Sequence, residues 1–379
     1  MWIASGQSNM EMSVNSSTGA TEAKAAAKNP NLRLFTVKKT ASDTPQSDVP
    51  RDGNNGKWLE AGPDTIGGFS AVAYYFARDI QKALNVPVGI IHSSWGGTAA
   101  EEWTSMPVLD ANPQQKGKHP RQAKLYNGMI APLIPYAIKG AIWYQGESNA
   151  GRHAEYAELM GLMIKNWRDD WKQGDFPFLF VQLAPYLDIG NKPNDPEWVK
   201  LREIHLKSPT DTNWARLREA QVNTLKVKNT GMAVITDVGD ETDIHPKRKE
   251  QVGARLALAA RAIAYGEKIE FVGPWFDKMS GEGKKAVLSF THLGKGLEAK
   301  GGELTGFTVA GKDRKFHNAK AEIMGDTVVV WSDEVEKPVA VRFGWANFPI
   351  VNLFNKDGLP ASPFRTDDWP KMAAVQPSK

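Results

Sequence analysis

Four short apolar runs in this chain each lead into a cluster of small polar or ionisable residues. The runs cover residues 2–4, 88–91, 141–144 and 232–235. The clusters that follow them are Ser5-Gly6-Gln7-Ser8-Asn9, Gly96-Gly97-Thr98, Gln145-Gly146-Glu147-Ser148-Asn149 and Asp243-Ile244-His245-Pro246. Short apolar runs bounded by turn signals are typical of buried strands. Because open α/β folds bind ligands at the carboxyl ends of parallel strands, we expect these clusters to meet at one edge of a sheet.

Helical patterns separate the predicted strands. Apolar residues recur at helical spacing over residues 72–84 and 156–167, a further helix begins at 216–221, and another follows His245, with Pro246 suited to its start and Gly266 to its end. A buried-type strand is predicted at 178–183. Strands that alternate with helices favour a parallel sheet covered on both faces. The polar segments 38–69, 107–123 and 186–213 are predicted to be long surface loops.

The pattern changes near residue 267. Four β-rich segments, 287–291, 306–309, 327–331 and 339–343, are separated by turn signals, which predicts a small all-β region built as a partial sandwich. We therefore predict an α/β domain over residues 1–266, a β-rich domain over 267–370 and a tail over 371–379. Because the chain begins inside its first predicted strand, we expect that an upstream segment, including any signal segment, is missing from this sequence.

Composition removes several classes of function. The 47 Lys and Arg residues are scattered and the net charge is only +4, which favours a solvated surface over a nucleic-acid interface. No run approaches the roughly 18 apolar residues of a membrane span. The absence of cysteine excludes a disulfide scaffold, a Cys nucleophile and Cys-ligated zinc. The sequence also contains no P-loop, no dinucleotide fingerprint and no His-Glu-x-x-His motif, so we predict neither a metal nor a cofactor.

The four clusters contain the parts of a serine hydrolase. Ser8 can be the nucleophile, His245 its base and Asp243 the acid that orients the base. Donors for an oxyanion could be the Ser8 N–H, the N–H of Gly96 or Gly97, and a side-chain amide from Gln145 or Asn149. Each of these residues alone is more often a turn, a cap or part of a polar loop. Their common placement after predicted strands favours catalysis.

Two other functions fit parts of the same pattern. Glu101, Glu102 and Glu147 could supply the paired carboxylates of a glycosidase. A glycan-binding protein that has lost turnover is the second alternative, and the 13 tryptophans offer flat faces on which sugars can stack. The intact set of Ser8, Asp243 and His245 argues against an inactive site.

Together, four motifs resemble the sialate O-acetylesterase family, a branch of the SGNH hydrolase superfamily that is related to acetyl xylan esterases. They are Gly6-Gln7-Ser8-Asn9-Met10, Ser94-Trp95-Gly96-Gly97-Thr98, Trp143-Tyr144-Gln145-Gly146-Glu147-Ser148-Asn149 and Asp243-Ile244-His245-Pro246. The resemblance covers most of residues 1–265 and continues in 343–347 and 359–365. It implies a flavodoxin-like three-layer α/β/α domain and metal-free deacetylation through an acetyl-serine intermediate.

The resemblance also implies roles for individual residues. Ser8 is then the nucleophile, His245 the base and Asp243 the orienting acid, while the Gly96-Gly97 turn and Gln145 complete the oxyanion hole. The residues implied to contact substrate are Gln7, Trp95, Glu101, Trp103, Glu147 and Asn149. Many superfamily members place the acid three residues before the histidine, where this chain has Thr242, so Asp240 is an alternative to Asp243. Similarly, Asn149 is an alternative to Gln145.

The expected protein is an extracytoplasmic carbohydrate O-acetylesterase, periplasmic or secreted, with an acetylated sugar as its partner. The sequence does not distinguish acetylated sialic acid from acetylated xylan or another hemicellulose, and it does not predict an oligomeric state. Members of the family commonly carry an upstream β domain, which this sequence lacks.

Overall fold

The computed structural model describes residues 1–119, 121–190 and 192–370, and the chain divides into two compact units. The first contains Met1–Gln182, Ala220–Ala233 and His245–Ile269, and the second contains Leu183–Glu219, Val234–Ile244 and the chain from Glu270 onward. The predicted division at residues 266 and 267 treats each domain as one continuous stretch, whereas two inner segments group with the β-rich part. The predicted tail, 371–379, lies outside the described residues.

A seven-stranded sheet forms the centre of the first unit, in the order β3-β2-β4-β1-β5-β6-β7. Neighbouring strands are parallel except for β3, which pairs antiparallel with β2 at the edge. The strands are β1 (Trp2–Gly6), β2 (Asn29–Thr36), β3 (Trp58–Ala61), β4 (Val88–Ser94), β5 (Gly140–Tyr144), β6 (Phe178–Val181) and β7 (Thr230–Ala233).

The strand order explains where the site forms. Numbered among themselves, β4-β1-β5-β6-β7 have the flavodoxin-like order 2-1-3-4-5, and β2 and β3 extend the sheet beyond β4. The order therefore reverses at β1, and the carboxyl end of β1 is the switch point at which such sheets bind ligands. Every residue of β1 and β5 is buried, as expected for parallel strands covered on both faces. The predicted α/β class is confirmed.

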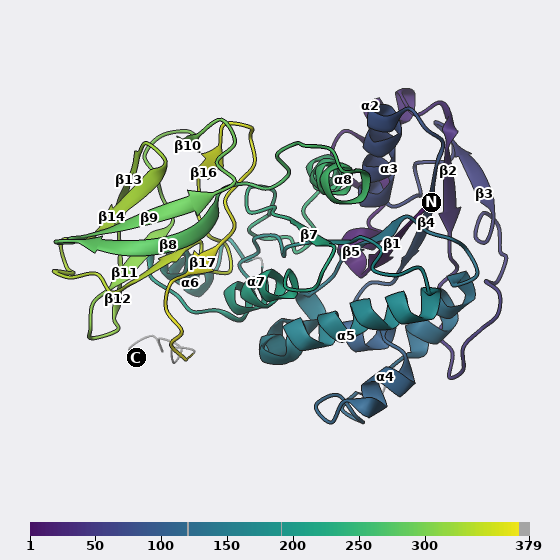
Figure 1. Cartoon of the computed structure of the whole chain (residues 1–379), viewed down its shortest axis with the longest axis horizontal. Helices are drawn as coiled ribbons and strands as arrows, with labels where there is room; N and C mark the ends of the chain where they lie inside the picture. Colours follow the sequence, from purple (N-terminus) through teal and green to yellow (C-terminus); the bar gives the residue numbers. More distant parts are fainter. Residues whose placement is uncertain (120, 191, 371–379) are drawn as a thin grey trace. The chain divides into compact units, whose positions relative to one another are not determined.

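Helices cover both faces of this sheet (Figure 1). Helices α3 (Ala71–Leu84) and α8 (Lys249–Tyr265) pack together on one face, and α5 (His153–Trp171) covers the other. The shorter helices are α1 (Ser8–Glu11), α2 (Ala20–Ala25) and α4 (Met106–Ala111), and α7 (Asn213–Thr224) contributes its last turns to this unit. Helix α8 ends at Gly266 as predicted, with φ of 73°, but begins at Lys249 rather than at Pro246.

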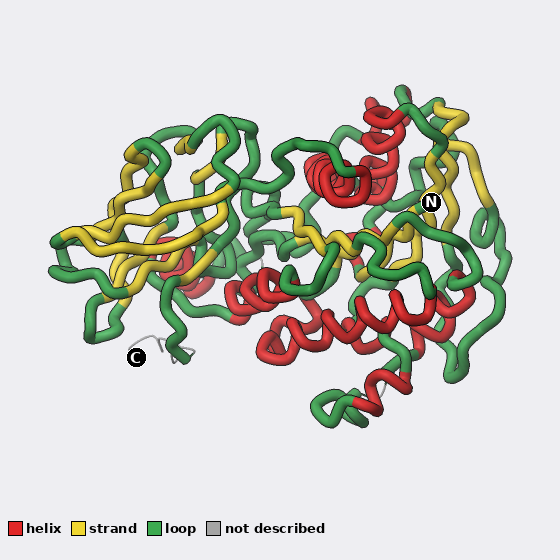
Figure 2. Tube along the Cα trace, viewed as in Figure 1, coloured by secondary structure: helices red, strands yellow, loops and turns green. Residues whose placement is uncertain are grey.

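The second unit contains two four-stranded antiparallel sheets, β12-β11-β15-β17 and β13-β14-β9-β8, and a ladder of β10 with β16. Their inner faces share one core, in which Leu288 and Val328 of one sheet meet Val309 and Val341 of the other. Figure 2 shows that loops rather than helices join these strands. The strands are β8 (Trp275–Glu282), β9 (Lys285–Thr291), β10 (Leu297–Ala299), β11 (Phe307–Ala310), β12 (Phe316–Asn318), β13 (Lys320–Met324), β14 (Thr327–Trp331), β15 (Ala340–Phe343), β16 (Leu353–Asn355) and β17 (Phe364–Arg365). The predicted all-β region is confirmed.

The three predicted loops all contain regular structure. Strand β3 lies within 38–69, α4 overlaps 107–123, and α6 (Pro196–Lys207) lies within 186–213. Helix α6 begins with Asp195, whose carboxylate accepts a hydrogen bond from the Glu197 N–H at 2.9 Å. Trp198 is the buried residue of this helix. With so little of its surface buried, the helix lacks the one-sided apolar pattern by which helices are predicted, and its sequence resembles a loop. Among the described residues, no helix is long and apolar enough to cross a bilayer.

Candidate active site

The end of β1 is fixed between its two neighbouring strands. The Gly6 carbonyl accepts a hydrogen bond from the Trp95 N–H at 3.1 Å, and the Gln7 N–H donates to the Tyr144 carbonyl at 3.0 Å. Gly6 has φ of 139°, and a Cβ at this position would lie 2.2 Å from the Tyr144 oxygen. Only glycine fits here. The sharp turn makes Ser8 the first residue of α1, at the carboxyl edge of the sheet.

The Ser8 hydroxyl meets the predicted base. The Ser8 Oγ lies 2.8 Å from the His245 Nε2, and both residues are partly exposed. The two residues are 237 positions apart along the chain and belong to the same compact unit. A neutral imidazole at this distance can accept the hydroxyl proton as the oxygen attacks a carbonyl. The structure therefore brings together the nucleophile and base that the sequence predicts.

The two candidate orienting acids lie in a turn of the second unit. One oxygen of Asp240 accepts hydrogen bonds from the Thr242 N–H at 2.9 Å, the Asp243 N–H at 3.0 Å and the Thr242 hydroxyl at 3.1 Å. Asp240 therefore shapes the turn that carries Asp243. Asp243 itself precedes His245 by two positions in the chain.

The Gly96-Gly97 turn packs against the serine. A Cβ on Gly96 would lie 3.1 Å from the Ser8 Cβ. The Gly96 N–H donates to a Glu11 carboxylate oxygen at 2.7 Å, so it has an acceptor in this structure, and its role as an oxyanion donor stays a prediction. Gly97 is exposed with φ of 75°, and its N–H has no acceptor within the part of the chain that the structure describes. The Ser8 N–H is at a helix start and has no intrahelical acceptor.

Gln145 is buried, and its side-chain amide forms hydrogen bonds with other residues of the protein. Its amide nitrogen donates to the Thr98 carbonyl at 3.1 Å and to the Asn149 side-chain oxygen at 2.7 Å, and its oxygen accepts from the Tyr156 hydroxyl at 2.9 Å. Both N–H bonds of the amide are therefore occupied. Donation from Gln145 to an oxyanion would require one of these two hydrogen bonds to be given up, and this role stays a prediction. In this structure, Gln145 joins the loop after β4 to the loop after β5.

Three residues predicted to contact the substrate are buried. Glu101 is 1% exposed, and Trp103 and Asn149 are 0% exposed. The Trp103 indole N–H donates to the Thr98 hydroxyl at 2.9 Å, and the Asn149 amide donates to Glu101 at 3.1 Å. Glu101 and Trp103 belong to the short 3-10 helix Ala100–Trp103, which turns their side chains inward, and Asn149 belongs to the 3-10 helix Glu147–Arg152. All three side chains face the protein interior in this structure, and their direct contact with substrate stays a prediction.

The other three residues predicted to contact substrate lie in the segments that follow β1, β4 and β5, and their contact with substrate stays a prediction. Trp95 and Glu147 are partly exposed, with the Lys39 ammonium 5.7 Å from the centre of the Trp95 ring. Gln7 is nearly buried, and its side-chain oxygen accepts the Ser148 N–H at 3.3 Å.

A buried polar chain beneath the serine escaped the sequence analysis. Lys249 is 0% exposed and donates to the side-chain oxygen of Asn9, whose amide donates to Glu147 at 2.6 Å. Burial raises the pKa of the Glu147 carboxyl above its ordinary value, although the Asn9 hydrogen bond and the Lys249 charge oppose this shift. Their positions in the sequence could have indicated these residues, because Asn9 directly follows Ser8 and Lys249 comes four residues after His245.

The carboxylates considered for a glycosidase are engaged with cations or buried. Glu101 pairs with Arg152 at 2.6 Å, and Glu102 pairs with Arg121 at 2.8 Å. One oxygen of Glu147 is buried without a hydrogen-bond partner. Within residues 1–119, 121–190 and 192–370, no group of three acidic, His or Cys side chains could hold a metal ion.

The chain is similar to proteins of known activity. Sialate O-acetylesterase from Pongo abelii is 33% identical over 320 residues, which cover 77% of this chain and 58% of that protein. The Homo sapiens sialate O-acetylesterase is 32% identical with the same coverage. The chain thus spans less than two thirds of the length of these relatives.

A solved structure gives a closer match over more of the chain. The crystal structure of a carbohydrate acetylesterase from Xanthomonas citri superposes with a TM-score of 0.86 at 44% identity, covering 97% of this chain and 80% of that one. The family model described as carbohydrate esterase, sialic acid-specific acetylesterase, matches residues 1–262. These matches confirm the resemblance drawn from the four motifs. The chain therefore belongs to the carbohydrate esterase family of sialic acid-specific acetylesterases.

Proposed function

We propose that this protein is a serine-dependent carbohydrate O-acetylesterase, a carboxylic ester hydrolase that removes acetyl groups from sugars. The observation that carries the proposal is the 2.8 Å contact between the Ser8 hydroxyl and the His245 imidazole at the switch point of the sheet. Family membership over residues 1–262 supports the reaction class. We further propose an extracytoplasmic site of action, where acetylated polysaccharides and glycans occur.

The proposed reaction has two acyl-transfer steps. The Ser8 oxygen attacks the acetyl carbonyl while His245 takes the hydroxyl proton, and the N–H groups of Ser8 and Gly97 stabilise the resulting oxyanion. The intermediate collapses, the sugar hydroxyl leaves with the proton from His245, and acetyl-Ser8 remains. Water then attacks this ester with His245 again as the base, which releases acetate and restores Ser8.

Asp243 is the proposed orienting acid of a Ser-His-Asp triad. Its closeness to His245 in the chain supports this role, and Asp240 is already committed to three hydrogen bonds in the turn beside it. Asp243→Asn should lower the rate strongly, because the imidazole then loses its fixed tautomer. Asp240→Asn should lower it much less. The reverse ranking would transfer the role to Asp240.

The first experiment measures acetate release by this chain and by Ser8→Ala. The substrates are 4-nitrophenyl acetate, acetylated xylan and acetylated sialic acid, which also ranks the candidate sugars. We expect Ser8→Ala to lose essentially all turnover. Full activity in Ser8→Ala would reject the mechanism, and tight glycan binding without acetate release would favour a binding protein.

A further inference from the structure

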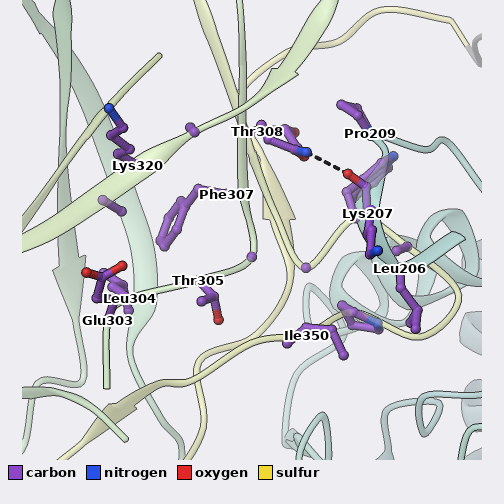
Figure 3. Close-up of a pocket in the computed structure, with 18 of the residues that line it drawn as sticks. Leu206, Lys207, Pro209, Glu303, Leu304, Thr305, Phe307, Thr308, Lys320 and Ile350 are labelled. Carbon is purple, nitrogen blue, oxygen red and sulfur yellow. Dashed lines mark hydrogen bonds between the residues drawn. The ribbon is translucent and has the colours of Figure 1, made fainter. Parts of the chain in front are cut away.

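A cavity of about 810 Å³ lies entirely within the second unit and contains no residue of the candidate active site. Residues 205–210, at and after the end of α6, form one wall (Figure 3). Strands β11 to β13 and the loops 303–306 and 344–350 form the others. The volume is within the range of about 300–1,000 Å³ that is typical of small-molecule sites.

Hydrogen bonds hold the walls of this cavity in place. The Asn318 amide donates to the Lys207 carbonyl at 2.6 Å, which joins β12 to the end of α6. The Thr305 N–H donates to the Asn352 side chain at 2.9 Å, and the same amide donates to the Glu303 carbonyl at 2.8 Å. Because side chains and backbone fix the lining from several elements, the cavity is preformed and a ligand need not order it.

The positive charges in the lining are neutralised by acidic neighbours. The Lys207 ammonium pairs with Glu203 at 3.0 Å, and the Lys320 ammonium pairs with Asp333 at 2.9 Å. Burial lowers the pKa of His205 below its ordinary value, although Asp188 opposes this shift, so the imidazole is neutral at pH 7. The cavity therefore offers no uncompensated cation to an anionic ligand.

Two carboxylates in the lining are available to a ligand. Glu303 and Glu322 are exposed, and neither forms an ion pair within the described part of the chain. In Figure 3, Glu303 lies on the same side of the cavity as Lys320 and Phe307. A carboxylate accepts hydrogen bonds from hydroxyl groups and repels another anion. This charge selects a neutral ligand rich in hydroxyls.

Apolar surface completes the lining. Phe307 forms part of the wall, Phe348 is partly exposed, and Ile350 is 52% exposed. A pyranose ring presents a face of C–H groups and a rim of hydroxyls, so it needs apolar contact on one side and acceptors at its edge. The combination of Phe348 and Ile350 with Glu303 and Glu322 meets both needs.

We propose that this cavity is a second carbohydrate-binding site, which takes a neutral segment of the glycan chain. The choice of a sugar over another neutral ligand rests on the proposed function. Glu303 and Glu322 accept hydrogen bonds from the sugar hydroxyls, and the C–H face of a ring packs against Phe348 and Ile350. Anionic sugars, acetylated sialic acid included, bind poorly here because Lys207 and Lys320 are paired with Glu203 and Asp333, which leaves the Glu303 and Glu322 carboxylates to repel an anion.

The test measures binding in a Ser8→Ala background, so that an acetylated ligand is not consumed. Isothermal titration with acetylated xylo-oligosaccharides is compared between Ser8→Ala alone and the same protein with Glu303→Ala and Glu322→Ala. We expect a loss of affinity of about tenfold or more, as for a lost charge-assisted hydrogen bond. Ile350→Arg, which fills the cavity mouth from an exposed position, should have a similar effect.

A matched control is Met324→Ala, on the same strand as Glu322 but outside the lining and 60% exposed. It should leave binding unchanged. In the Ser8 protein, the cavity variants should hydrolyse 4-nitrophenyl acetate at the normal rate and acetylated xylan more slowly. Unchanged affinity in both cavity variants, or tighter binding of sialyl-oligosaccharides than of xylo-oligosaccharides, would overturn the proposal. Absence of serine-dependent hydrolysis would instead reject the proposed function, because the titration requires no turnover.

Discussion

Glu11 provides the sharpest test of how the turn beside the nucleophile is built. One of its carboxylate oxygens accepts the Gly96 N–H at 2.7 Å, and the other lies 2.5 Å from the Lys39 ammonium. Glu11→Ala leaves the Gly96 N–H without its acceptor and releases the turn that carries the Gly97 N–H. A hydrogen bond to a charged group contributes about 1.5–3 kcal/mol. Because the Glu11 side chain is 33% exposed, we expect the lower part of this range.

A loss of about 1.5–2 kcal/mol in transition-state stabilisation corresponds to a rate reduction of about tenfold to thirtyfold. The assay is kcat and kcat/KM on 4-nitrophenyl acetate, together with a thermal melt that checks the fold. Glu11→Gln keeps an acceptor for Gly96 and should retain most activity. Lys39→Met removes the exposed ion pair and the ammonium over the Trp95 ring but leaves the Glu11 acceptor in place, so it should cost less than Glu11→Ala. A rate within twofold of the parent in Glu11→Ala would refute the reasoning. Equal losses in Glu11→Gln and Glu11→Ala would show that charge, not the hydrogen bond, matters.

Three further outcomes follow from the same geometry. Gly6→Ala should lower both the unfolding temperature and the activity, because its Cβ would lie 2.2 Å from the Tyr144 oxygen, whereas Gly68→Ala, with no atom within 4 Å, should be mild in the same melt. Burial lowers the pKa of His92 from 6.5 to about 4, so the unfolded chain takes up a proton at a higher pH than the folded protein does. The free energy of unfolding should therefore fall by up to roughly 3 kcal/mol as the pH drops from 6.5 to 4. Chemical denaturation across this pH range should show this fall in the parent and not in His92→Gln. Burial raises the pKa of Glu147, so the stability of the folded protein should fall as the pH rises above 4.5 and this carboxyl loses its proton. Glu147→Gln should reduce this pH dependence above 4.5 when it is measured by the same chemical denaturation.

The sequence predicted the elements that depend on strong local patterns. The buried strands β1, β4 and β5 and the helices α3 and α5 have clear apolar runs or helical spacing, and the structure contains all five. Strand β3 was missed because it is a four-residue edge strand with a partly exposed Trp58, and α6 because it buries only one of its apolar side chains. Neither element has the one-sided apolar pattern on which prediction from sequence depends.

The residues of the site also differ in how far the sequence could place them. Ser8 and His245 could be predicted because each follows a strand, and parallel strands bring their carboxyl ends together whatever their separation in the chain. No comparable rule predicts which way a side chain in a loop will point. Glu101 and Trp103 come soon after the Gly96-Gly97 turn, but a 3-10 helix turns them into the core. Nearness to a motif was therefore a poor guide to the exposure of these two side chains.

Buried hydrogen bonds connect the segments that surround Ser8. The Gln145 amide donates hydrogen bonds to Thr98 and Asn149. In the same way, Asn9 joins Lys249 to Glu147 through its side-chain amide. Each set joins segments that follow different strands, so the positions of these segments are coupled by buried hydrogen bonds. An oxyanion donor must be held within a fraction of an ångström of its place, and flexible loops alone cannot do this. The hydrogen bonds of these polar residues thus fix the segments around Ser8 and Gly97 in this structure.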